Sequence, residues 1–222
     1  MDTDRLIQSL AAKAEPVTPL RRPAWRAAGW ALMAAGYLAA LVIVISPRED
    51  LGRRMQDWRF LTEQAAALAT GLSAAVVAFA TVVPGYRRRL LLFPAVPLVV
   101  WVGVVAAGAL REYAASGAGV LAWQLDWGCV GTILGGSAVP AVAMGVMLRW
   151  GAPVTPRLSA AYGALAAAGL GNLGVCLFHP HSSDLILLVW HCGTVLAFTA
   201  VAGLAGAYLL PWPPRDRAAL VA

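Results

Sequence analysis

The chain has 222 residues, of which 60% are hydrophobic and only 13% are charged, and its formal net charge is +6. A typical soluble domain carries about 25% charged residues, so this composition excludes an ordinary soluble enzyme or binding module and favours an integral membrane protein. The basic charge comes without a zinc-finger, RRM or basic-helix pattern, and we therefore expect no direct binding to nucleic acid.

Residues 1–25 form an N-terminal tail with a short predicted helix. Asp2, Thr3 and Asp4 offer capping groups and negative charge at its start. Apolar residues then recur on one face at helical spacing: Leu6, Ile7, Leu10 and Ala11. Such a helix lies on anionic lipid or binds in the groove of a partner protein, and we expect these four residues to bind a partner.

Six segments without Asp, Glu, Lys or Arg in their interiors follow. Each can hold the roughly 20 residues that cross a bilayer as a helix, and each is apolar all round rather than on one face. We predict an all-α fold, with one bundle of six transmembrane helices in residues 26–210 and a C-terminal tail in 211–222. The predicted spans are about 26–46, 62–83, 90–110, 128–148, 158–178 and 185–209.

Most Lys and Arg residues fall on one side of this topology. That side holds the N-terminal tail, the loop with Arg87, Arg88 and Arg89, the loop with Arg149 and Arg157, and the C-terminal tail. Because basic loops stay inside, both termini are predicted to be cytoplasmic in a bacterial inner membrane.

Local spacing predicts several contacts within the bundle. Arg59 and Glu63 are four residues apart and are expected to pair. Small residues at the same spacing suggest close helix packing. These small-residue faces are Gly131 and Gly135; Gly163, Ala167 and Gly171; and Gly203 and Ala207.

Cysteine and histidine gather on the opposite, outer side. Cys129 begins the fourth span, Cys176 ends the fifth, His179 lies in the loop that follows, and His191 lies inside the sixth. Thiolate and imidazole together suit soft or borderline metals, so these four residues are a candidate heavy-metal site. Alternatively, two thiols whose Cα atoms come within about 7 Å form a disulfide. A cysteine in an apolar helix also serves as a small hydrophobic residue, which is the simplest interpretation of Cys192.

Motifs for catalysis and transport are missing. The sequence has no Gly-rich phosphate loop and no nucleophile elbow, so we expect no enzyme and no required cofactor. Two alternatives stay open. A small metal or solute transporter would need a polar path at mid-membrane. A membrane thiol oxidoreductase would be expected to carry a Cys-x-x-Cys pair.

Short motifs in order along the chain carry a family resemblance. They include Thr3 to Ile7, Leu10 to Ala12, Arg59-Phe60-Leu61, Pro84-Gly85, Asp126-Trp127-Gly128-Cys129, Leu148 to Pro153, Phe178-His179-Pro180 and Val189-Trp190-His191. With this set, nearly the whole chain resembles the NrsF-like family of membrane anti-sigma factors.

The resemblance implies a six-span inner-membrane protein that holds an extracytoplasmic-function (ECF) sigma factor inactive on the cytoplasmic side. It also implies a stress sensor whose outward-facing cysteines respond to heavy metals or oxidants. By this resemblance, Cys129 matches the family's Asp-Trp-Gly-Cys motif, and Cys176, which precedes Phe-His-Pro, is expected to be the second sensing cysteine. Cys192 follows Trp-His at a position where other members vary.

Overall fold

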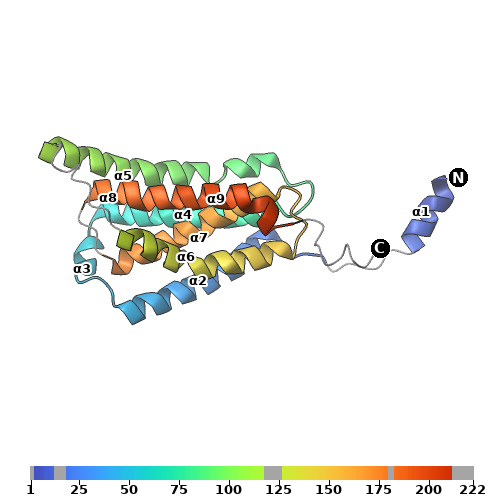
Figure 1. Cartoon of the computed structure of the whole chain (residues 1–222), viewed down its shortest axis with the longest axis horizontal. Coiled ribbons are helices and arrows are strands. Elements are labelled where there is room, and N and C mark those ends of the chain that lie inside the picture. The colour runs from blue at the N-terminus through green and yellow to red at the C-terminus, as the bar shows by residue number, and fades with distance from the viewer. Residues whose placement is uncertain (1–2, 13–18, 118–126, 180–182, 212–222) are drawn as a thin grey trace.

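The computed structural model describes residues 3–12, 19–117, 127–179 and 183–211, with the backbone alone for Trp127 and Cys129. All regular elements within these residues are helical (Figure 1). They are α1 (Thr3–Ala12), α2 (Pro23–Ile45), α3 (Leu51–Arg54), α4 (Trp58–Ala80), η1 (Arg88–Leu92), α5 (Ala95–Ser116), α6 (Trp127–Arg149), α7 (Pro156–Phe178), α8 (Asp184–Ile186), η3 (Leu187–Cys192) and α9 (Gly193–Leu209). In the described part of the chain, six helices are long and apolar enough to cross a membrane, which confirms the predicted all-α, six-helix class.

Local chemistry explains where two of these spans begin. The second begins at Trp58, ahead of the predicted 62, because Asp57 caps α4 by accepting a hydrogen bond from the Arg59 backbone N–H at 2.9 Å. The third is split into the 3₁₀-helix η1 and α5, with Pro94 at the N-cap of α5. Proline has no backbone N–H to donate, so it suits the start of a helix rather than its interior.

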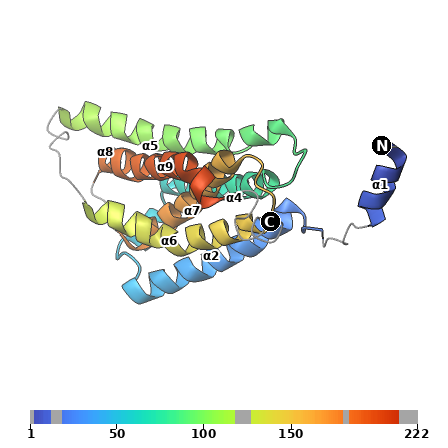
Figure 2. The ribbon, with the colours of Figure 1, turned by 45° about the vertical axis from the view of Figure 1, so that its right-hand side comes forward.

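Helix α7 lies at the centre of the bundle and packs against α4, α6 and α9 (Figures 1 and 2). In the most apolar window of each span, 78% of α7 and 67% of α4 is buried, against 17–28% for the other four. Small residues allow this close approach, because a Cβ built on Gly169 would lie 3.5 Å from the Cα of Gly71. A displacement of α7 therefore changes its packing against several helices.

The predicted small-residue faces are only partly correct. Gly163 and Gly171 of α7 contact α6, and a Cβ on Gly203 of α9 would lie 3.2 Å from the Cβ of Ala161. The face with Gly131 and Gly135 was wrong, since no atom of the described residues lies within 4 Å of a Cβ built on either glycine. Helix α6 is rotated so that Gly136 and Ser137 meet α7 instead.

The two ends of the bundle differ. We call the end that carries α3, α8, the start of α6 and the end of α7 the distal end, and the end where α2 begins the proximal end (Figure 1). Helix α1 stands beyond the proximal end, and no residue of it is buried. Its apolar residues Leu6, Ile7 and Leu10 are 40%, 58% and 61% exposed. Most of the predicted C-terminal tail lies outside the described residues.

Candidate functional site

The distal end of α7 holds a buried thiol and imidazole group. Cys176 lies in the last turn of α7 and has no exposed surface, while Cys192 is 3% exposed, and both are free thiols. His191 and Cys192 belong to η3, a six-residue π-helical segment within the last span. Such widened turns are rare and often mark functional sites, because the extra residue redirects side chains.

Hydrogen bonding fixes the orientation of the His191 ring. Its Nδ1 atom lies 2.6 Å from Asn172 Oδ1 and 3.9 Å from Cys176 Sγ. Because an amide oxygen only accepts, Nδ1 carries the hydrogen and donates it to Asn172. Asn172 precedes Cys176 by four residues, so one face of α7 presents both side chains to His191.

The loop after α2 covers this group. Arg48 is buried, and its backbone N–H donates to the carbonyl of Leu177 at 3.0 Å, beside Cys176. Its guanidinium donates to Asp50 at 2.5 and 3.0 Å. This hydrogen bond from Arg48 lowers the pKa of Asp50 to about 2. The ion pair therefore stabilises the loop itself at neutral pH, while the Arg48 backbone N–H attaches the loop to the end of α7.

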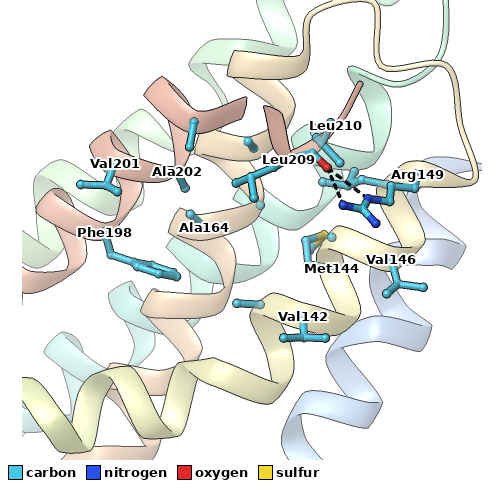
Figure 3. Close-up of a pocket in the computed structure, with 16 residues that line it drawn as sticks. Val142, Met144, Val146, Arg149, Ala164, Phe198, Val201, Ala202, Leu209 and Leu210 are labelled. Atoms are coloured by element: carbon cyan, nitrogen blue, oxygen red, sulfur yellow. Dashed lines mark hydrogen bonds between the residues drawn. The ribbon is translucent and has the colours of Figure 1, made fainter. Parts of the chain in front are cut away.

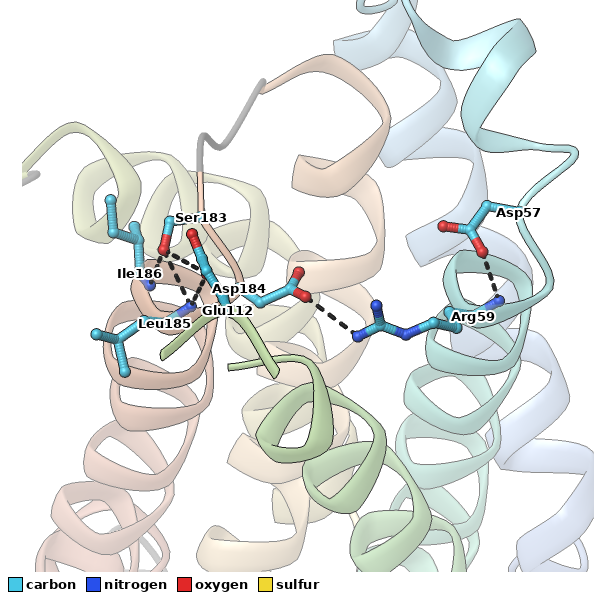
Figure 4. A network of polar contacts seen from close by, with 7 residues as sticks. All are labelled: Asp57, Arg59, Glu112, Ser183, Asp184, Leu185 and Ile186. Carbon is cyan, nitrogen blue, oxygen red and sulfur yellow. Dashed lines mark hydrogen bonds and ion pairs between the residues drawn. The ribbon is translucent and has the colours of Figure 1, made fainter. Parts of the chain in front are cut away.

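Three spans are joined beside the thiol group by Arg59, Glu112, Ser183 and Asp184, which we call the distal clasp (Figure 4). Arg59 donates to Asp184 at 3.1 Å, and the Ser183 hydroxyl donates to Glu112 at 2.9 Å. The predicted pairing of Arg59 with Glu63 was wrong. Gly108 of α5 leaves room for the observed pair, since a Cβ there would lie 2.2 Å from Arg59 Nη2 and 2.3 Å from Asp184 Oδ2.

A small polar cavity of about 60 Å³ lies under the distal clasp. It is lined by the clasp pair together with Arg54, Asp57 and Glu63. Glu63 is only 8% exposed, and its Oε1 atom has no hydrogen-bond partner among the described residues. A carboxyl group buried at this depth in a membrane protein is costly and is usually retained for function.

A comparison with protein families identifies the class of protein. The family model of NrsF, negative regulator of sigma F, matches residues 10–212. The chain belongs to the NrsF family. It is thus a negative regulator of a sigma factor, and a sigma factor is its partner. Neither the curated proteins nor the solved structures contain a match to this NrsF chain.

The NrsF match includes all six spans and the whole thiol group, but only part of the predicted partner-binding face. Leu10 and Ala11 lie inside the matched region, whereas Leu6 and Ile7 precede it. The role of these four residues therefore stays a prediction.

The structure brings together some of the predicted site residues of this NrsF protein. Cys176 and His191 are neighbours, and His179 follows α7 directly as its C-cap. Cys129 lies at the start of α6, at the same distal end, but its side chain is outside the described part. Among the described side chains, no three His, Cys, Asp or Glu residues are placed to hold a metal ion. Cys176, His179 and His191 therefore do not form a metal site without a further ligand.

Sequence reasoning missed several residues of the site. Asn172 was not predicted as a site residue, although its spacing of four from Cys176 places both on the same helix face. Arg48 and Asp184 lie between the predicted spans, and nothing in their spacing indicates that they contact the distal end of the bundle.

Proposed function

We propose that this protein is a membrane anti-sigma factor for an ECF-type sigma factor. It holds the sigma factor at the cytoplasmic face of a bacterial inner membrane through α1. It releases the sigma factor when Cys129 and Cys176, near the outer face, bind a heavy-metal ion or are oxidised. The metal ion acts as the signal, and the protein needs no cofactor and catalyses no reaction.

The arrangement of the two ends is the observation that supports this proposal most. A buried thiol beside an imidazole lies at the distal end of the central helix, while an exposed amphipathic helix extends from the proximal end. With 23 residues, α7 is roughly 34 Å long, about the thickness of the hydrocarbon core. In this proposal the metal ion or oxidant acts at one end of the bundle around α7, and the sigma factor binds at the other end.

Cys129 is a suitable second ligand by its position in α6. It precedes Ile133 by four residues and Ser137 by eight, and both of these side chains are 1% exposed. Because residues four apart share a helix face, Cys129 is in register with the positions of α6 that are buried in the bundle. A soft metal ion bound between Cys129 and Cys176 would displace the thiol protons and draw α6 toward α7.

Contacts at the proximal end could transmit such a movement of α6 to the helix that is proposed to bind the sigma factor. Arg26, near the start of α2, is buried, donates to the Met147 carbonyl of α6 and lies over the Phe79 ring of α4 at 4.6 Å. A movement of α6 against α7 therefore changes the anchor of α2, which α1 precedes. A coupling of about 1–3 kcal/mol changes partner affinity roughly 5- to 150-fold.

Co-purification from detergent-solubilised membranes tests the proposal. We expect a sigma factor to co-purify with the full chain and to be released by Cd²⁺ or by a small oxidant. Cys176→Ser should retain the sigma factor but resist release. Cys192→Ser is the matched control because this thiol is also buried, and it should respond like the unchanged protein.

Failure at two points would count against the proposal. If no sigma factor co-purifies under any condition, the partner assignment is wrong for this chain. If Cys129→Ser and Cys176→Ser variants both release normally, the thiols are not the sensor. A variant lacking residues 3–12 locates the partner site, since retained binding would move that site from α1 to the proximal loops.

A further inference from the structure

A groove of about 900 Å³ runs between α4 and α5, two helices that pack side by side (Figures 1 and 2). Along α4 it extends from Thr62 to Ser73, which is about 16 Å at 1.5 Å per residue. This stretch is close to half of the roughly 30 Å hydrocarbon core, which is about the length of one acyl chain, and the groove continues past it to Arg87 and Arg89. Its volume is also within the range of ligand sites, about 300–1,000 Å³.

The wall of the groove is apolar in effect. The hydroxyls of Thr62 and Ser73 line it, but they donate to carbonyls of their own helix, at Trp58 and Ala69, over 2.8 and 2.6 Å. Phe93 and Val96 supply the opposite side, and both are largely exposed, at 58% and 72%. Such a surface selects a hydrocarbon chain rather than a polar solute.

Positive charge is concentrated at the proximal end of the groove. Arg87 and Arg89 line it there, and neither guanidinium takes part in an ion pair within the described part of the chain. The groove between α6, α7 and α9, of about 540 Å³, is different (Figure 3). Its one lining arginine, Arg149, already donates to the Leu209 carbonyl at 2.9 and 3.1 Å.

The segment that carries these arginines is held in place by the central helix. The Tyr162 hydroxyl of α7 donates to the Leu91 carbonyl in η1 at 2.7 Å. Just before the turn, the Ala152 N–H donates to the Val82 carbonyl at 3.2 Å. The turn itself uses Gly85 at φ +82°, a conformation that suits glycine. The backbone that carries Arg87 and Arg89 is therefore held in place at the proximal end of the groove.

We propose that the groove between α4 and α5 is a binding site for an anionic phospholipid. One acyl chain lies along α4 and α5, and the headgroup phosphate lies between Arg87 and Arg89. Basic pockets between transmembrane helices are known to hold anionic headgroups, and the phosphate supplies the anion that these two arginines lack. The site is independent of the thiol group at the other end of the bundle.

Native mass spectrometry of the full chain in detergent tests this site. The purified protein is titrated with phosphatidylglycerol or with phosphatidylcholine of the same acyl chains, and the bound lipids are counted. We expect preferential retention of phosphatidylglycerol. Arg87→Gln/Arg89→Gln should weaken that binding about 25- to 30-fold, because each arginine near an anionic lipid contributes roughly a fivefold change in affinity and the two factors multiply.

Matched variants distinguish lipid binding in this groove from the general attraction of anionic lipids to basic residues. Arg21→Gln/Arg22→Gln removes the same charge from exposed positions at the same proximal end and should leave the lipid count unchanged. Ala69→Trp fills the groove and should exclude the lipid, whereas Leu68→Trp, exposed on α4 but outside the groove, should not. Equal retention of both lipids, or equal losses in the two arginine pairs, would overturn the proposal.

Discussion

The contact between α6 and α7 gives a sharp test of the packing, through the substitution Gly171→Ala. A Cβ at Gly171 would lie 2.2 Å from Ser137 Oγ, 3.0 Å from Ser137 N and 3.1 Å from Ser137 Cα. The hydroxyl can rotate away, but the backbone atoms cannot. The two helices must therefore move apart at this contact, which lies one residue before Asn172 and five before Cys176.

The size of the effect follows from two opposing terms. Overpacking of this kind costs about 1–3 kcal/mol. Replacing a helical glycine by alanine gains up to about 1 kcal/mol of helix propensity. Gly135→Ala on α6 shares the second term but not the first, because nothing lies within 4 Å of its built Cβ. The difference in unfolding free energy between these two variants should therefore be about 1–3 kcal/mol.

Thermal unfolding of the detergent-solubilised protein measures that difference. For a chain of this size each kcal/mol moves the midpoint by about 2–4 °C, with Gly171→Ala as the less stable variant. Adding Ser137→Ala to Gly171→Ala should recover only part of the loss, since the backbone contacts remain. If Gly171→Ala proved as stable as Gly135→Ala, the close packing of α6 on α7 would be refuted.

Three further predictions concern the polar contacts. Asn172→Leu leaves the His191 Nδ1–H without its acceptor and should lower stability by about 1–3 kcal/mol in thermal unfolding, whereas Thr199→Val should change it little. Arg26→Met removes a buried donor to Met147 and should cost about 1.5–3 kcal/mol, with the exposed Arg21→Met as the control. The pKa of Asp50 falls on folding from 3.8 to about 2, so its stabilising contribution is present above about pH 4 and is lost as the pH falls toward 2. The stability difference between the unchanged protein and Asp50→Asn should accordingly be constant from neutral pH to about pH 4 and then shrink.

The six spans could be predicted from the sequence because a bilayer requires long apolar segments whatever their neighbours are. The packing faces could not. Gly131 and Gly135 have the spacing of a contact face, yet a Cβ on either would meet no atom of the described residues within 4 Å, and Gly136 and Ser137 contact α7 instead. In apolar helices hydrophobicity does not mark which side is buried, because lipid is as apolar as the helix interior. Only the fit between particular helices decides it.

The candidate site shows the same limit. The topology alone places Cys176 and His191 near one end, and the structure makes them neighbours. Local spacing suggested that Arg59 pairs with Glu63, but the partner is Asp184, 125 residues away along the chain. Arg59 pairs with Asp184 rather than with Glu63 because Gly108 of the intervening helix leaves space for the long-range pair. Such a vacancy in a third helix cannot be detected by spacing along one helix.

Burial of the thiol restricts which signals the proposed sensor can receive. Cys176 has no exposed surface, and the loop anchored by Arg48 covers the end of its helix. A reagent must therefore be small, or the distal end must open first. Opening separates Arg48 from Leu177 or Arg59 from Asp184, and both contacts are polar ones near the boundary of the bundle. In the proposed mechanism, the free energy of binding a soft metal ion to the thiols offsets the free energy lost when those polar contacts break. A hard cation has little affinity for sulfur and offers no such compensation. The selectivity of the sensor would then depend on the covering contacts as much as on the cysteines themselves.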